Sequence, residues 1–334
     1  MLYTRLCDLF GIEHPVLNAP MGGGDAPARL AAAVSEAGGL GLIGGTTAGG
    51  VVWLVEQIRV ARESTDRPFG VGFISHRTNT AELMTAALDE GVRIIAHSFA
   101  DPAPFMEAAH AAGALVLCQV RSVDAARRAA DCGVDVITAQ GTEAGGHTGR
   151  VSTFPFVPAV VDAVGAVPVL AAGGIGDGRG LAAALMLGAE GVWIGTRFLA
   201  TVECGVSDAY KERVREADGS DTVLTDLFDI AIGASWPEGV SGRAIRNEFS
   251  RRWAGREAEL RTWAAEHRDE YRRPDPNVET AEKAIWAGEA ASFVTATETA
   301  GDVVRDLVAG ATAVLRRRSA VVLEDRPEPP AAAE

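Results

Sequence analysis

One histidine of the chain lies inside a glycine-rich stretch that directly follows a predicted buried strand. The stretch covers residues 139–149 (AQGTEAGGHTG), and the apolar run before it covers residues 134–138 (VDVIT). Glycine allows the backbone to approach a flat ligand closely, and a histidine held there can transfer protons near neutral pH. His147 is therefore our candidate general base. The alternative is a glycine-rich turn with a solvated histidine.

Two further glycine-rich segments follow later predicted strands and suit a phosphate group. They cover residues 170–177 (LAAGGIGD) and residues 191–197 (GVWIGTR). Loops after strands seven and eight form the usual phosphate site of a (β/α)8 barrel, and the start of a helix adds its positive dipole end. The hydroxyl of Thr196 adds a donor. Tight glycine turns without a ligand are the alternative.

Residues at the ends of three other predicted strands would face a ligand lying across the same surface. Residues 19–24 (APMGGG) supply apolar bulk and open backbone, and Gly72 and Gln119 end the third and fifth strands. Two more histidines, His76 and His97, also follow strands, and we expect His97 to be a core residue. No nucleophile elbow, Walker loop or HExxH pattern occurs, so no metal is expected.

Short apolar runs alternate with alanine-rich helical runs over residues 16–194, which is the pattern of an α/β protein. The number and regular spacing of these units indicate a (β/α)8 TIM barrel. A doubly wound sheet is the competitor, but no GxGxxG motif opens the first helix. A glycine follows five of the helices, as expected for a left-handed stop before the next strand. The predicted strands cover residues 16–18, 40–43, 69–74, 93–96, 115–118, 134–138, 167–170 and 191–194, and the predicted helices cover residues 27–37, 51–63, 80–89, 103–112, 123–132, 155–164 and 177–187.

The pattern changes between residues 202 and 290, where arginines become frequent. We expect a mostly helical insertion after strand eight that covers the C-terminal face of the barrel, where barrel active sites lie. The barrel then consists of residues 1–201 and 291–320, with a final helix over residues 302–317. The arginines either pair with acids of the insertion or bind substrate phosphates. The tail, residues 321–334, ends in a segment rich in proline, alanine and acids and is expected to be disordered.

The composition is that of an ordinary globular protein, with 334 residues, 47% hydrophobic and 23% charged, and a net charge of −14. The acidic balance argues against a nucleic-acid partner. Four scattered cysteines without a CxxC pair fit a reducing, cytoplasmic setting, and Cys118 lies in an apolar run as a core residue would. The N-terminus lacks the pattern of a signal peptide, and no apolar stretch is long enough to span a bilayer, so no membrane partner is expected.

At these positions the chain resembles the nitronate monooxygenase family, formerly called 2-nitropropane dioxygenases. The matching motifs lie in the family's order between residues 10 and 200. They are residues 19–21 (APM), 37–41 (AGGLG), 140–147 (QGTEAGGH), 171–175 (AAGGI) and 195–196 (GT). Flavin-dependent enoyl-acyl-carrier-protein reductases and some acyl-CoA dehydrogenases share nearly the same motifs. The resemblance therefore implies a flavin-binding barrel more sharply than it implies one substrate.

The resemblance implies FMN as the cofactor and His147, in the Gly-Gly-His motif, as the catalytic base. The family's strand-six glutamine that contacts the flavin matches Gln140, and its phosphate positions match Gly174 and residues 193–196. Many members carry an asparagine after strand three, where this chain has Gly72. The residues expected at the FMN site are Ala19, Pro20, Met21, Gly22, Gly72, Gln119, Gln140, Ala144, Gly145, Gly146, Ala172, Gly173, Gly174, Trp193, Ile194, Gly195 and Thr196.

The expected reaction is oxidation of a nitroalkane or its nitronate by molecular oxygen. His147 would remove the α-proton of the neutral nitroalkane, and the flavin would carry the redox chemistry. A reductase or dehydrogenase that acts on an acyl thioester with NAD(P)H is the second hypothesis. A non-redox barrel for a phosphorylated substrate is the third.

The resemblance does not fix the substrate pocket, because none of Tyr3, Tyr210 and Tyr271 can be assigned to the active-site tyrosine that some members carry. The partners that follow from the expected reaction are a small-molecule substrate and O2. The sequence leaves open the electron donor and the oligomeric state, for which a homodimer is one option.

Overall fold

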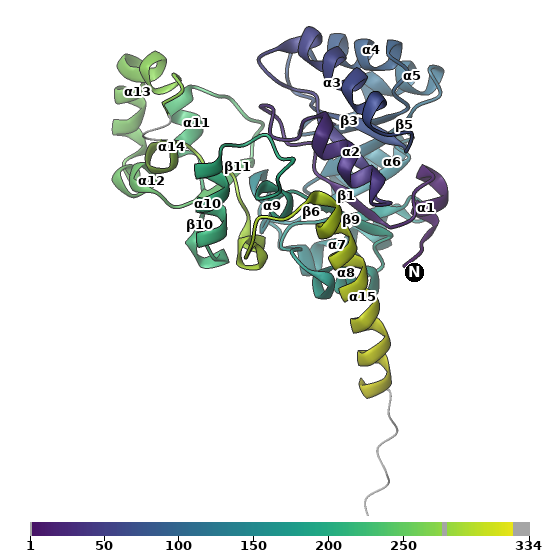
Figure 1. The fold of residues 1–334 in the computed structure, drawn as a ribbon. Helices are drawn as coiled ribbons and strands as arrows, with labels where there is room; N and C mark the ends of the chain where they lie inside the picture. Colours follow the sequence, from purple (N-terminus) through teal and green to yellow (C-terminus); the bar gives the residue numbers. More distant parts are fainter. Residues whose placement is uncertain (1, 276–278, 323–334) are drawn as a thin grey trace, which may run out of the picture.

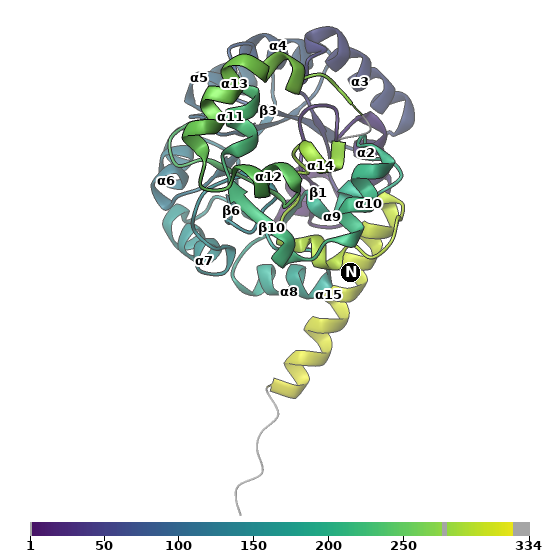
Figure 2. The same cartoon turned by 90° about the vertical axis from the view of Figure 1, so that its left-hand side faces the viewer.

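A barrel of parallel strands forms the body of the molecule. In the computed structural model, which describes residues 2–275 and 279–322, eight parallel strands alternate with helices. Figure 2 looks along the barrel and shows helices α3 to α8 arranged around the strands, with the insertion in front. The (β/α)8 architecture predicted from the sequence is confirmed.

The elements of the barrel begin and end close to the residues predicted. Its strands are β1 (Val16–Asn18), β2 (Gly41–Gly44), β3 (Phe69–Ile74), β4 (Ile94–Ser98), β5 (Leu115–Val120), β6 (Val136–Gln140), β8 (Val169–Ala172) and β9 (Gly191–Ile194). Its helices are α1 (Arg5–Phe10), α2 (Ala28–Glu36), α3 (Gly50–Ser64), α4 (Thr80–Asp89), α5 (Ala103–Ala111), α6 (Val123–Asp131), α7 (Thr153–Val164), α8 (Gly178–Met186), α9 (Thr196–Leu199) and α15 (Ala300–Val322).

Closure of the barrel depends on one buried side chain. The strand order is β1-β9-β8-β6-β5-β4-β3-β2, and a single backbone bridge, between Leu17 and Leu40, joins the first and last of these strands. Beyond that bridge the side chain of Asn18 takes the place of a neighbouring backbone. Its Nδ2 donates to the carbonyl of Leu42 at 2.8 Å, and its Oδ1 accepts from the N–H of Leu42 at 2.8 Å. Asn18 is fully buried, so water cannot replace these bonds.

The interior of the barrel is packed and closed at one end. Inward-pointing strand residues such as Leu17, Leu117 and Leu170 form one buried cluster with Leu6 and Phe10 of α1. Helix α1 therefore seals the end at which the strands begin. The carboxyl ends of the strands face the insertion, which lies at the left of the barrel in Figure 1.

The turns between helices and strands follow the glycine pattern of the sequence. The five glycines predicted to stop helices have φ angles between +72° and +93°, a region that residues with a Cβ rarely adopt. These glycines are Gly38, Gly91, Gly113, Gly133 and Gly188.

Residues 202–290 contain a small sheet as well as the expected helices. Strands β10 (Thr222–Thr225) and β11 (Ser241–Ile245) pair antiparallel, and β7 (Gly146–Thr148), from the loop after β6, pairs with β11. The mostly helical prediction missed this sheet because its strands are short and one partner comes from the barrel. The other elements are α10 (Asp208–Glu216), η1 (Gly219–Asp221), α11 (Leu227–Ile232), α12 (Glu248–Trp253), α13 (Glu257–Tyr271), α14 (Glu279–Glu282) and η2 (Glu289–Phe293).

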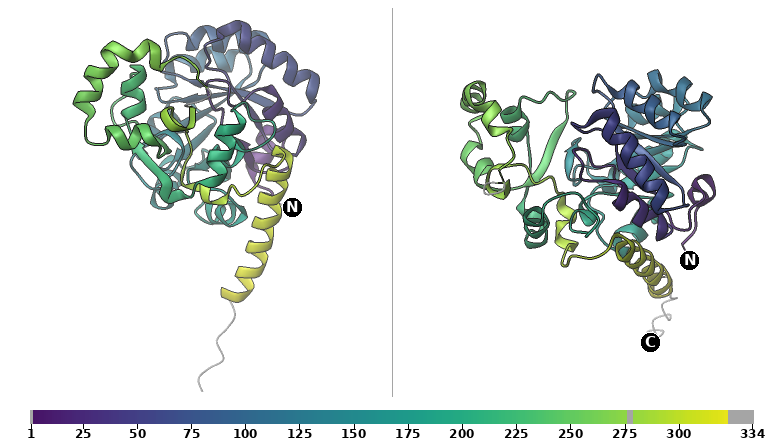
Figure 3. Two further views of the ribbon diagram at one scale, coloured as in Figure 1. Left: turned by 60° about the vertical axis from the view of Figure 1, so that its left-hand side comes forward. Right: turned by 45° about the horizontal axis from the view of Figure 1, so that its top comes forward.

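The last helix, α15, packs against α8 and α2, and Figure 3 shows its second half leaving the body of the barrel. A Cβ added at Gly178 would lie 2.6 Å from the Cα of Gly310, so α8 and α15 touch backbone to backbone. The helix includes residues 321 and 322 of the predicted disordered tail, and the rest of that tail lies outside the described residues. In the described ranges, none of the helices has both the length and the apolar character needed to cross a membrane.

We predict that Asn18→Ala destabilises the barrel by about 2–4 kcal/mol, because it leaves the N–H and carbonyl of Leu42 buried and unpaired. Urea unfolding followed by circular dichroism measures this. The matched control is Thr138→Val on β6, since the buried Thr138 hydroxyl has no hydrogen-bond partner and its loss should cost little. Equal stability of wild type and Asn18→Ala would contradict this role of Asn18.

Candidate active site

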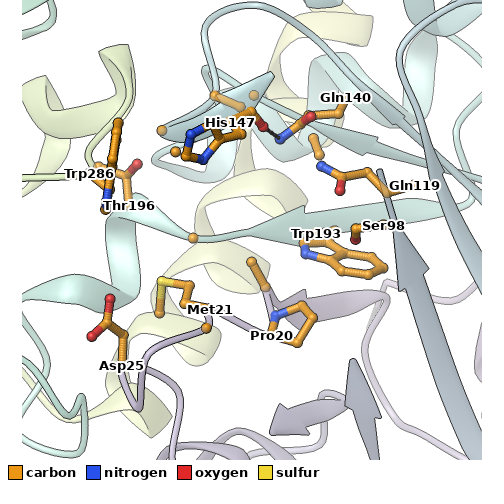
Figure 4. Close-up of a pocket in the computed structure, with 18 of the residues that line it drawn as sticks. Pro20, Met21, Asp25, Ser98, Gln119, Gln140, His147, Trp193, Thr196 and Trp286 are labelled. Carbon is orange, nitrogen blue, oxygen red and sulfur yellow. Dashed lines mark hydrogen bonds between the residues drawn. The ribbon is translucent and has the colours of Figure 1, made fainter. Parts of the chain in front are cut away.

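A cavity of about 490 Å³ lies at the carboxyl ends of the barrel strands, between the barrel and the insertion. Its size is in the range of small-molecule and cofactor sites. Figure 4 shows its lining side chains pointing toward a common space. The sequence-predicted residues that the structure brings together here are Ala19, Pro20, Met21, Gly22, Gln119, Gln140, Ala144, Gly145, Gly146, His147, Ala172, Gly173, Gly174, Trp193, Ile194, Gly195 and Thr196.

Gly72 is the one predicted cofactor residue that the structure separates from the cavity. It lies under Pro20, and a Cβ added at Gly72 would be 2.2 Å from the Cγ of that ring. Phe73 and Ile74, the next residues of β3, line the cavity instead. Pro20 therefore occupies the space that the family's asparagine side chain would need.

His147 is held by a carboxylate of the insertion. Its Nε2 lies 3.0 Å and 2.9 Å from the two carboxylate oxygens of Asp229 on α11, and both side chains are 9% exposed. The indole N–H of Trp236 donates to Asp229 Oδ1 at 2.9 Å, and the Trp236 ring stacks on His147 at 3.5 Å between centroids. In the neutral imidazole, Nε2–H donates to Asp229, so Nδ1 carries the free lone pair. The arrangement suits a base that accepts its proton at Nδ1.

The pairing of β7 with β11 fixes His147 in this position. In the ladder His147 lies opposite Gly242, and a Cβ at Gly242 would be 2.3 Å from the ring of Trp286. Glycine at this position therefore lets the indole lie close to the strand pair, 4.8 Å from the His147 ring between centroids. Gln140 also holds the backbone of His147, because its Nε2 donates a hydrogen bond to the His147 carbonyl at 3.1 Å.

The cavity wall offers polar atoms and bare backbone to a flat, phosphorylated ligand. Gln140 Oε1 is buried without a hydrogen-bond partner, so a ligand N–H there would satisfy it. Gly173 and Gly174 have φ angles of +104° and +71°, and with Gly195 they present backbone without side chains. Thr196 Oγ1 accepts from the N–H of Gly288 at 2.9 Å, which leaves its proton to donate. These features fit a flavin with a terminal phosphate.

The other two strand-end histidines lie outside the cavity lining. His97 is fully buried, lies with Nδ1 2.8 Å from Ser75 Oγ, and stacks on Phe105. Burial lowers the pKa of His97 to about 4, which fits the core role expected from the sequence. His76 packs against Trp236, and burial lowers its pKa as well.

The contributions of the insertion escaped the sequence analysis. Asp229 stands alone in the apolar segment 227–232 (LFDIAI), and a lone acid in such a segment was a usable signal. Trp236, Trp286 and Tyr210 also line the cavity, although nothing in their local sequence marks them. Gly23 and Ile175, from the predicted segments 19–24 and 170–177, line it too, and the further lining residues that were not predicted are Asp25, Phe73, Ile74, Ser98, Phe99, Leu199, Ala284 and Ala290.

This cavity and the barrel are those of a flavin-dependent oxidoreductase. The family model for nitronate monooxygenase matches residues 3–87 and 78–310, and the chain belongs to that family.

Three similar proteins show how widely this scaffold is used. A (3aS,4S,5R,7aS)-5-hydroxy-7a-methyl-1-oxo-octahydro-1H-indene-4-carboxyl-CoA dehydrogenase of Mycobacterium tuberculosis is 40% identical over 250 residues, covering 74% of this chain and 67% of the relative. A probable nitronate monooxygenase of Staphylococcus saprophyticus is 30% identical over 295 residues, covering 74% and 80%. The structure of FabK from Thermotoga maritima superimposes with a TM-score of 0.85 and 33% identity, covering 96% of this chain and all of that one.

We predict that Asp25→Asn stabilises the protein above pH 6 and not below pH 4. Burial, and the charge of Glu279, raise the pKa of Asp25 from 3.8 to about 6. Ionisation of Asp25 therefore costs more in the folded chain than in the unfolded one, and the penalty grows as the pH rises from about 4 to about 6. Asn should remove a penalty of about 2–3 kcal/mol at pH 8. Urea unfolding of both proteins from pH 4 to pH 8 measures it, and a difference independent of pH would contradict it.

Proposed function

We propose that this enzyme oxidises nitroalkanes or their nitronates with molecular oxygen and FMN, and that His147 is its general base. The observation that carries this proposal is the buried contact of His147 with Asp229 at the wall of the cavity. Membership of the nitronate monooxygenase family and the staphylococcal relative support it.

In this proposal the protein's residues handle the proton. The α-carbon of a neutral nitroalkane lies against His147, and Nδ1 removes the α-proton. Asp229 accepts the Nε2–H bond, keeps the ring in the reactive tautomer and stabilises the imidazolium that forms. Trp236 and Trp286 exclude water from the base. Flavin, when bound, supplies the electron transfer and the reaction with oxygen.

We further propose how the chain holds FMN. Gln140 Oε1 accepts from a ring N–H, and the loop at Gly145 lies flat against the ligand. Glycine is required at position 145 for packing as well, because a Cβ there would be 2.5 Å from the N of Gly288. The backbone of Gly173 and Gly174, with Gly195 and Thr196, holds the phosphate. The four cysteines are free thiols, which is compatible with the reducing, cytoplasmic setting that we propose.

An oxidoreductase for an acyl thioester is the second candidate. Two arginines after β3 and β5 favour it, because Arg77 and Arg121 lie over Trp236 and Phe99 at the cavity and have no carboxylate partner among the described residues. They would suit an anionic substrate. The mycobacterial relative is named for a CoA substrate. Arginines of the insertion are less suited, since several are engaged in ion pairs, namely Arg243 with Glu289, Arg252 with Glu282 and Arg256 with Glu259.

We propose that residues 202–290 act as a cover for the site, because Asp229, Trp236 and Trp286 all come from this segment and surround His147.

We predict that His147→Ala slows oxidation of a neutral nitroalkane by about 10²–10⁴-fold, the usual contribution of a general base. A preformed nitronate has already lost the α-proton, so its oxidation should slow far less. Oxygen uptake on both substrate forms, at matched flavin content, measures this. Equal losses on both forms would mean that His147 orients the substrate and is not the base.

Asp229→Asn separates positioning from proton removal in the same assay. The amide can no longer stabilise the imidazolium, so the neutral substrate should again lose more rate than the nitronate. The loss should be smaller than for His147→Ala, because the ring itself remains. An unchanged rate on the neutral substrate would remove Asp229 from the mechanism.

We predict that the purified protein releases FMN and that Gly174→Asp abolishes flavin retention. The new carboxylate would face the phosphate, and like charges repel. The matched control is Gly113→Asp, because Gly113 has φ +72° against +71° at Gly174 but follows α5, away from the cavity. Chromatography of the denatured supernatant identifies the flavin. FAD in the wild type would contradict this placement of the phosphate. Full flavin occupancy in Gly174→Asp would contradict it as well.

A further inference from the structure

We propose that Asp25 and Tyr210 form a polar subsite of the cavity that binds a hydroxyl group of the substrate. This inference rests on the proposed function and narrows its substrate to nitroalkanes that carry a hydroxyl group. Both residues line the cavity that contains His147, Asp25 from the loop after β1 and Tyr210 from α10. Figure 4 shows the Asp25 carboxylate directed into the space below Thr196 and Trp286.

The backbone at Asp25 is held firmly by the segment that leads into the insertion. The N–H of Gly205 donates to the Asp25 carbonyl at 2.9 Å, and Cys204 Sγ lies 3.0 Å from the same oxygen. A Cβ at Gly205 would be 2.0 Å from the carbonyl oxygen of Gly24, so the two loops are in close contact. This anchoring fixes the loop that carries the Asp25 side chain and the start of the segment that carries Tyr210.

The side-chain oxygen atoms of this pair bond to no side chain among the described residues. The half-buried Asp25 carboxylate makes no hydrogen bond or ion pair with the described residues. The Tyr210 hydroxyl is buried without a side-chain partner, and the backbone N–H of Trp286 faces its oxygen. Such groups are costly when unpaired, and each one in a folded protein calls for an explanation. A ligand that supplies their hydrogen bonds provides it.

A hydroxyl group matches this pair in hydrogen bonding and in charge. The carboxylate accepts the hydroxyl proton, and the phenol donates to the hydroxyl oxygen. An anionic ligand group would be repelled by Asp25 and by the charge of Glu279, which raises the pKa of Asp25 further. Apolar residues such as Leu199 and Ala290 also line the cavity, so the substrate's carbon chain can pack against them.

The test compares two substrates that differ in one group. The ratio of kcat/KM for 3-nitro-1-propanol to that for 1-nitrobutane reports recognition of the hydroxyl, because the two differ by OH against CH3. A hydrogen bond to a charged group corresponds to a factor of about 10–100. We expect the wild type to prefer the hydroxylated substrate by that factor, and Asp25→Leu and Tyr210→Phe each to lose most of the preference. Ser98→Ala, which removes another hydroxyl of the cavity lining, should keep it.

Equilibrium dialysis of both compounds against the holoenzyme separates this inference from the proposed function. Preferential binding of the hydroxylated compound without oxidation of either would leave the subsite standing and overturn the proposed function. Oxidation of both at equal kcat/KM by the wild type would overturn the subsite. So would an unchanged ratio in Asp25→Leu and Tyr210→Phe. A loss of FMN affinity in these variants with the ratio preserved would mean that the pair serves the flavin, and would overturn it too.

Discussion

The pairing of β7, a three-residue strand in the loop after β6, with β11 of the insertion is the interaction on which the site depends. It places His147 next to Asp229, and it brings the indoles of Trp236 and Trp286 to the imidazole. The described barrel residues alone offer His147 no carboxylate. The pairing tolerates little change, because a side chain at Gly242 would collide with Trp286. A barrel with this loop but without the insertion would have the histidine and lack the groups that orient it.

Several polar groups at the cavity lack the hydrogen-bond partners that buried groups usually have. At the closure of the barrel a buried polar side chain is fully paired, as Asn18 is with Leu42. Around the cavity, Gln140 Oε1 and the Tyr210 hydroxyl are buried without partners, and burial raises the pKa of Asp25 to about 6. Unsatisfied groups that line a cavity are expected at functional sites, where a bound ligand can supply the missing hydrogen bonds.

The barrel could be predicted from sequence because its signals are local and repeat eight times. Apolar runs, alanine-rich helices and stop glycines such as Gly38 each act within one unit, and predicted helix 80–89 matches α4 residue for residue. The motif residues that meet at the cavity could be placed for the same reason, since parallel strands end on one face. Asp229 and Trp236 could not be placed beside His147 from the sequence. Their approach to it requires a pairing between segments about a hundred residues apart, in a sheet of short strands. Gly72 lies outside the cavity lining because Pro20 covers it, and the position of Pro20 depends on tertiary packing.

The central claim is that the His147–Asp229 pair removes a proton from carbon inside the flavin cavity. The most direct measurement is the primary deuterium isotope effect on kcat/KM with nitroethane deuterated at carbon 1, for the wild type and for Asp229→Asn. The account predicts a primary effect in the wild type and one at least as large in Asp229→Asn, because weakening the base makes proton removal more rate-limiting. Rates that are indifferent to deuterium in both proteins would contradict it.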